Sequence, residues 1–223
     1  MGPVIGDILP LALGVAISPV PIIAVILMLL SPKARGTSIG FLLGWVLGIL
    51  VAIVVFTLLS SVLPRSDADQ PKPVAGVITI VLGLGLLLLA VRQWRSRPAP
   101  GSEPALPKWM AAIDTMTAGR ALVLAFLIAA LNPKNLLMAI AAGVAIGAGT
   151  TSTGTAAVAI IIYTVIAAST IAIPVIAYLV ASKRMAGPLD SLRTWLLHNN
   201  ATIMAVVLLV IGVVLIGKGL GDF

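Results

Sequence analysis

The chain has 223 residues, of which 60% are hydrophobic and only 9% are charged, and its mean hydropathy is +1.19. Soluble domains carry about 25% charged residues, so this composition excludes that class and indicates an integral membrane protein. The net charge of +7 does not indicate a nucleic-acid partner, because most Lys and Arg lie in short segments beside apolar stretches, where they set membrane orientation.

Six apolar stretches are long enough to cross a bilayer, and together they predict an all-α integral membrane protein. In chain order, the predicted spans are Ile5–Leu30, Thr37–Leu63, Pro73–Val91, Arg120–Gly149, Thr155–Val180 and Ala201–Lys218.

The cations between the spans predict the orientation. Of the 14 Lys and Arg, most fall on one side of the predicted topology, and these are Lys33, Arg35, Arg92, Arg95, Arg97, Lys108, Arg120, Lys183, Arg184 and Arg193. Only Arg65, Lys72 and Lys218 fall on the other side. The positive-inside rule places the larger group in the cytoplasm, so we expect a protein of the cytoplasmic membrane with both termini outside the cytoplasm.

Two segments between the spans have apolar residues at helical spacing. They are "LPKWMAAIDTMTAGR", with Trp109, Met110, Ile113 and Met116, and "GPLDSLRTWLLHNN", with Leu189, Leu192, Trp195 and Leu196. Such segments can lie flat on the cytoplasmic surface as amphipathic helices. Loops that merely touch the headgroups are the alternative.

Gly36, Gly40, Gly44 and Gly48 recur every four residues at the start of the second span. A stripe of this kind allows another helix to approach closely. We expect packing within the chain, and a homodimer seam is the alternative.

The sequence contains a weak internal repeat. "AISPVPIIAVILMLL" (16–30) matches "ALNPKNLLMAIAAGV" (130–144) in the order of a small polar residue, a proline and a long apolar run. The chain therefore reads as one transmembrane domain, with repeat one at 1–95, a cytoplasmic linker with an amphipathic helix at 96–119, and repeat two at 120–223. Three spans per repeat imply opposite orientations, the inverted-repeat plan of secondary transporters.

Ser18-Pro19 and Asn132-Pro133 predict a break in the first helix of each repeat. Ser and Asn are favoured N-cap residues, and proline is favoured at the first helical position. Each break lies roughly 18 Å from either end of its span at 1.5 Å per residue, near the middle of the bilayer. Two half-helices would start there and present unpaired N–H groups and positive dipole ends.

Lys134 adds a full positive charge at the same depth, and its side chain is too short to reach the membrane surface. We therefore expect it to face a hydrated cavity that binds a phosphate or carboxylate. Purely structural proline kinks are the alternative. The predicted substrate-binding residues are Ser18, Pro19, Pro21, Asn132, Pro133, Lys134 and Asn135.

The sequence argues against enzymatic activity. The predicted spans hold no His, no Cys and no deep Asp or Glu, so a nucleophile with its base, paired acids and a catalytic metal are all missing. A deep lysine disfavours a metal site, and we expect no cofactor. The sequence has no P-loop motif, so we expect no direct use of ATP.

The stretches "LPLALGVAISPVPIIAVILMLLSPKARG", "LPKWMAAIDTMTAGR" and "RALVLAFLIAALNPKNLLMAIAAG" resemble the Gap-like family of sulfolipid- and peptidoglycolipid-addressing proteins, within the lysine-exporter superfamily of transporters. The resemblance covers nearly the whole chain. It implies six spans in two three-helix halves and a role in moving cell-envelope lipids or glycolipids across the cytoplasmic membrane.

The expected function is therefore a transporter or flippase for an anionic amphiphile, with membrane lipids and an anionic lipid or glycolipid as partners. Two alternatives remain open. One is an exporter of a small soluble solute such as an amino acid, and the other is a membrane scaffold that recruits lipid-synthesis enzymes.

Overall fold

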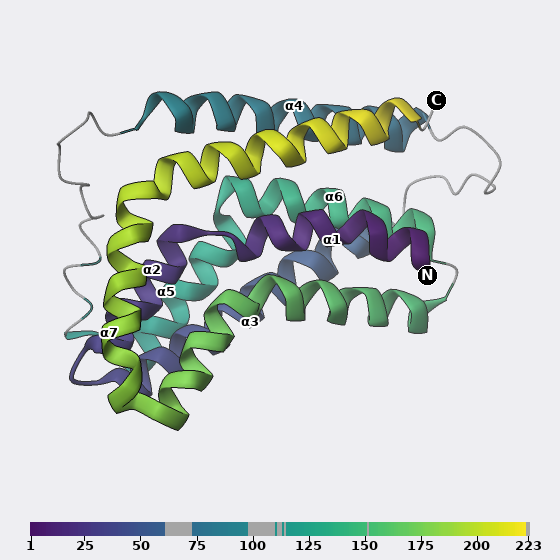
Figure 1. The fold of residues 1–223 in the computed structure, drawn as a ribbon. Helices are drawn as coiled ribbons and strands as arrows, with labels where there is room; N and C mark the ends of the chain where they lie inside the picture. Colours follow the sequence, from purple (N-terminus) through teal and green to yellow (C-terminus); the bar gives the residue numbers. More distant parts are fainter. Residues whose placement is uncertain (61–72, 98–109, 111–112, 114, 151, 222–223) are drawn as a thin grey trace.

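The computed structural model describes residues 1–60, 73–97, 110, 113, 115–150 and 152–221. This part of the chain is helical and contains no strand. Its helices are α1 (Gly2–Ala16), α2 (Pro19–Leu30), α3 (Ala34–Ser60), α4 (Pro73–Arg95), α5 (Ala118–Leu131), α6 (Pro133–Gly149) and α7 (Thr153–Gly221), as Figure 1 shows.

Two helix pairs are bent at the predicted breaks, α1 with α2 by 51° and α5 with α6 by 62°. Ser18 and Asn132 have extended backbones, and a proline follows each of them at the first helical position. The proline ring and its missing N–H stop the preceding helix and leave the next one free to start. The two predicted breaks are confirmed.

The membrane character of the chain is also confirmed. Within the described residues, four helical stretches are long and apolar enough to span a bilayer, and the number is six if each bent pair counts as one span. The chain is thus a multi-pass membrane protein. The inverted relation between its two halves stays a prediction.

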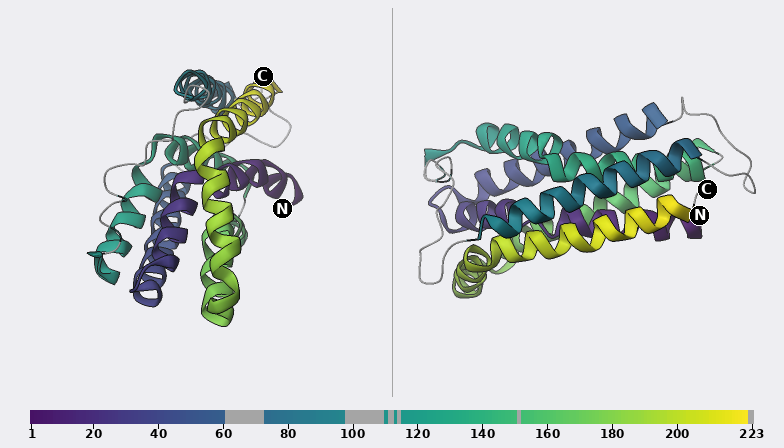
Figure 2. Two further views of the ribbon diagram at one scale, coloured as in Figure 1. Left: turned by 60° about the vertical axis from the view of Figure 1, so that its left-hand side comes forward. Right: turned by 90° about the horizontal axis from the view of Figure 1, so that it is seen from above.

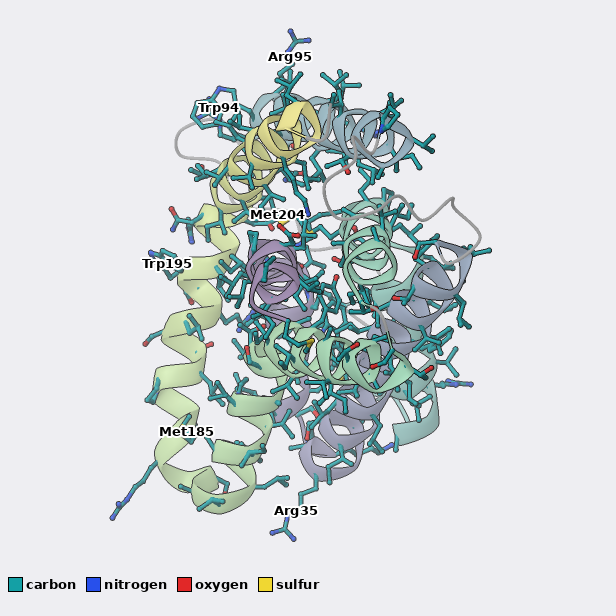
Figure 3. All side chains as sticks on the ribbon, turned by 90° about the vertical axis from the view of Figure 1, so that its right-hand side faces the viewer. Arg35, Trp94, Arg95, Met185, Trp195 and Met204 are labelled. Atoms are coloured by element: carbon teal, nitrogen blue, oxygen red, sulfur yellow. The ribbon has the colours of Figure 1, made fainter. Side chains whose placement is uncertain are left out.

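Helix α7, of 69 residues, consists of two helices joined at a kink, and it contains the last two predicted spans and the second amphipathic segment. It changes direction at Ala181, whose backbone angles of φ −139° and ψ 48° are not helical. The segment 187–200 is helical, as predicted, but it is not a separate helix. Leu189 and Leu196 are buried against the protein, whereas Leu192 and Trp195 are exposed, and Figure 3 shows Trp195 pointing away from the bundle.

The described apolar residues of the first amphipathic segment do not face a membrane surface. Met110, Ile113 and Met116 are buried in the hydrophobic core, and Trp109 lies outside the described residues. The expectation of an interfacial contact is therefore wrong for these three residues. The same spacing of apolar residues serves burial against protein and burial in headgroups, so the pattern alone cannot separate the two.

The glycine stripe of α3 packs against α5. A Cβ atom added at Gly40 or Gly44 would overlap a backbone carbonyl of α5, and one added at Gly48 would lie 2.7 Å from the Ala129 Cβ. The two helices approach so closely only because these residues lack a side chain. The expected packing within the chain is confirmed.

Helix α4 runs beside the last part of α7, as both figures of the ribbon show (Figures 1 and 2). Glycines again allow the two helices to come close together. A Cβ added at Gly83 would lie 2.8 Å from the carbonyl oxygen of Gly212, and one added at Gly219 would lie 2.7 Å from the carbonyl oxygen of Gly76. The N-terminus and the end of α7 lie at the same end of the bundle (Figure 1).

Candidate substrate-binding site

The two helix breaks meet, and Lys134 joins them. Its ammonium group donates hydrogen bonds to the carbonyl oxygens of Gly14 at 2.6 Å and Ile17 at 3.4 Å, and to the Ser18 hydroxyl oxygen. The side chain is only 3% exposed. The first turn of α6 is thus held against the point where α1 ends and α2 begins.

These bonds have a clear physical cause. The last carbonyl groups of α1 have no partner within the helix, because the chain turns at Ile17 and Ser18. The C-terminal end of a helix also carries a partial negative charge, which a cation stabilises. The ammonium of Lys134 supplies both the hydrogen bonds and the charge.

This arrangement corrects one expectation from the sequence. Lys134 was expected to present a free ammonium to a hydrated cavity, beside two positive helix ends, but in this conformation three oxygen atoms surround the ammonium. The expectation considered only the starts of α2 and α6. It left out the end of α1, whose carbonyl oxygens compete for the same charge.

The polar residues at the breaks have different partners. The Asn132 side-chain oxygen caps α6 by accepting a bond from the Lys134 backbone N–H at 2.9 Å. Ser18 makes no such cap for α2, and its hydroxyl accepts from the Lys134 ammonium instead. Asn135 donates from its amide to the Ala129 carbonyl oxygen of α5 at 3.2 Å, so it ties together the two halves of its own broken span.

Asn135 also holds an unused acceptor. Its side chain is 4% exposed, and its amide oxygen has no hydrogen-bond partner.

Among the predicted prolines, Pro19 and Pro21 are buried in α2, whereas Pro133 is exposed and borders a cleft.

Thr170 of α7 was not predicted as part of this region. Its hydroxyl donates to the Ala16 carbonyl oxygen at 2.7 Å, so α7 also supports the end of α1. The only sequence signal is the polar pair Ser169-Thr170 within an apolar span, four residues before Pro174.

A cleft of about 370 Å³ adjoins the junction of the two breaks. It lies between α2, α4, the α5–α6 break and α7, and Lys134 borders it. Figure 3 shows Met204 on the side of α7 that is turned toward the bundle. The lining residues are Val20, Leu89, Arg92, Gln93, Asn132, Pro133, Lys134, Asn200, Met204 and Leu208.

The lining combines cationic, amide and apolar groups. Arg92 and Lys134 bring the positive charges, and none of the described lining residues is acidic. Gln93, Asn132 and Asn200 bring amides, and the Asn200 amide oxygen is buried without a partner. Sequence reasoning used Arg92 only for orientation and placed Asn200 at the end of an amphipathic segment, so it missed both.

At the opposite end of the bundle, Asp7 of α1 and Lys218 of α7 form an ion pair at 2.6 Å. Both side chains are about one third exposed and border a small cavity of about 100 Å³. Among the described residues, no three His, Cys, Asp or Glu side chains come together in a group that could hold a metal ion.

Comparison with known proteins gives one match. The model of a protein family described as "Sap, sulfolipid-1-addressing protein" matches residues 8–221. No curated protein matches the chain, and no solved structure does. The wider placement in the lysine-exporter superfamily stays a prediction. Since the match covers nearly the whole chain, the protein belongs to the sulfolipid-1-addressing protein family.

Proposed function

We propose that this protein moves an anionic lipid or glycolipid of the cell envelope across the cytoplasmic membrane. Family membership supports lipid handling. The observation that carries the anionic part is the composition of the cleft beside the helix breaks, where Arg92 and Lys134 lie among amides and apolar side chains.

An amphiphile matches this lining. Its acidic headgroup would take hydrogen bonds and charge from Arg92 and Lys134, as guanidinium and ammonium groups give to phosphate, sulfate or carboxylate. The amide groups of Gln93 and Asn200 would serve the uncharged oxygens of the headgroup. Val20, Leu89, Met204 and Leu208 offer apolar surface to the adjoining carbon chain.

The mechanism would use the present partners of Lys134. An anion in the cleft competes with the Gly14 and Ile17 carbonyl oxygens for the ammonium. When the ammonium turns to the anion, α1 loses one of its two ties at the break, and the Thr170 bond remains. Occupancy of the cleft is thereby linked to movement of α1, which is what alternating access at broken helices requires.

The cation distribution supports a direction of opening. Arg92 belongs to the group of basic residues that the positive-inside rule places in the cytoplasm. The cleft would then be the site that loads from the inner leaflet, and the cavity beside Asp7 and Lys218 would lie on the outer side.

The test is a translocation assay with the purified protein in liposomes that contain labelled anionic and zwitterionic lipids. We expect faster movement of the anionic lipid, and we expect Arg92→Gln to slow it roughly tenfold or more, since hydrogen bonds to charged groups contribute about 1.5–3 kcal/mol. Arg35→Gln is the matched control, because Arg35 is exposed at a distant point of α3 (Figure 3).

Equal rates for both lipids would overturn the proposal, as would wild-type rates in Arg92→Gln. Uptake of free amino acids in place of lipid would favour the solute exporter. Absence of any transport, together with loss of cell function on changing Trp195, would favour the scaffold.

A further inference from the structure

A second hollow lies on the opposite side of the α4–α7 pair. It is a groove of about 200 Å³, lined by Ala90, Val91, Trp94 and Arg95 of α4 and by Ala205, Val206 and Leu209 of α7. None of these residues borders the cleft described above.

The helical register separates the two hollows. On α4, residues 89, 92 and 93 line the cleft, whereas residues 90, 91, 94 and 95 line the groove. At 100° per residue these two sets face opposite sides of the helix. On α7, residues 200, 204 and 208 line the cleft, and residues 205, 206 and 209 line the groove. These two sets also face opposite sides of their helix. The groove therefore faces outward, where a membrane-spanning bundle meets lipid.

Small residues form the floor of the groove. Ala90 and Ala205 are buried, while Val91, Val206 and Leu209 are about half exposed and form its sides. The lining is apolar, and the cations at one end of the groove favour an anionic lipid over a partner helix as its occupant.

Trp94 and Arg95 line one end of the groove, and Arg97 lies against Trp94. The Arg97 guanidinium carbon lies 3.2 Å from the centre of the Trp94 ring, and the Arg97 Nε donates to the Trp94 carbonyl oxygen at 2.9 Å. Arg95 lies beside them, and Figure 3 shows it pointing away from the bundle. Tryptophan and arginine favour the level of lipid headgroups.

We propose that this groove binds an anionic phospholipid, with one acyl chain along α4 and α7 and its phosphate at Arg95 and Arg97. The apolar lining selects the chain, and the cations at one end select the charge of the headgroup. This site is separate from the transport cleft, and it does not depend on the function proposed above.

The natural absence of cysteine allows a direct test. A single cysteine replaces Leu209 in the groove or Leu43 on α3, whose exposed fractions are nearly equal at 51% and 52%. Each variant carries a fluorescent label and is placed in bilayers with brominated phosphatidylglycerol or brominated phosphatidylcholine, which quench on contact. We expect phosphatidylglycerol to be preferred at position 209 by about fivefold for each contacting cation, and not at position 43.

Arg95→Gln should lower the preference at position 209 by about fivefold, and the double variant Arg95→Gln, Arg97→Gln should bring it close to that at position 43. Arg92→Gln, which changes the cleft, should leave the preference unchanged. The same preference at both positions would overturn the proposal. So would a preference that falls with Arg92→Gln and survives Arg95→Gln, because the lipid would then belong to the cleft. Little quenching by either lipid at position 209 would mean that another protein surface covers the groove, which also contradicts it. Because the assay records binding and no movement of lipid, its failure leaves the transport proposal standing.

Discussion

A helix that ends inside a membrane leaves carbonyl groups with no water to bind. At the end of α1, two side chains donate hydrogen bonds to these carbonyl groups. Lys134 bonds to Gly14 and Ile17, and Thr170 bonds to Ala16. The donors come from α6 and α7, so the break is tied to two elements far away in the sequence. An unmatched buried carbonyl costs about 1–3 kcal/mol, which is why such donors are needed.

Replacing Thr170 with valine keeps the shape of the side chain and removes its hydroxyl donor. We expect Thr170→Val to lower the free energy of unfolding by about 1 kcal/mol, because the Ala16 carbonyl keeps only its bond from the Ser18 N–H. Thermal unfolding in detergent measures the change. Ser169→Ala is the control, since the Ser169 hydroxyl bonds only within its own helix. A larger loss in the control than in Thr170→Val would disprove this role of Thr170.

At the residue scale the sequence predicted which positions matter and not what they contact. Ser18, Asn132 and Lys134 stood out because polar residues are rare in apolar spans. Two of the three acceptors of Lys134 are backbone carbonyl oxygens 117 and 120 positions earlier in the chain, and the identities of the side chains there do not predict them. Thr170 was missed because a threonine in a span commonly bonds to its own helix.

At the scale of elements, glycine spacing decides how the helices pack. Gly40, Gly44 and Gly48 of α3 lie against α5, and Gly83 and Gly212 bring α4 and α7 together. Without a hydrophobic driving force between helices in lipid, close backbone approach supplies much of the association. The rigid contact between α3 and α5 holds the start of the second broken span in place.

Gly44→Ala tests this packing. The added methyl group would overlap the Leu122 carbonyl, so the helices would have to separate, and we expect a loss of about 1–3 kcal/mol in stability. Gly36→Ala is the matched control on the same stripe, because its Cβ would lie 3.8 Å from the Ala118 Cβ, an ordinary contact. Thermal unfolding of both variants decides the matter, and equal stability of the two would contradict the packing described.

The elements were predictable where local chemistry fixes them. Proline after an N-cap residue sets both breaks, and long apolar runs set the spans. The helical continuation through Pro188 into the last span was not predictable, because Pro188 and the polar residues around it are typical of a loop. The burial of Met110, Ile113 and Met116 depends on which surface covers them, and an amphipathic pattern does not contain that information.

At the scale of the whole molecule, one lysine links the two helix breaks, one in each half of the chain. The ammonium lies between the end of α1, the start of α2 and the start of α6, and the cleft with Arg92 opens beside it. In the proposed mechanism, an anion in this cleft would draw the ammonium away from the carbonyl oxygens of α1, and α1 would then keep only its bond from Thr170. The account of transport rests on this link.

The most direct test compares Lys134→Gln and Lys134→Arg in liposomes, with Arg35→Gln as a control that removes a distant charge. The initial rate of anionic-lipid translocation is measured at equal amounts of folded protein. We predict at least a tenfold loss in Lys134→Gln, substantial recovery in Lys134→Arg because the charge is restored, and no change in the control. Translocation by Lys134→Gln at the wild-type rate would contradict the account.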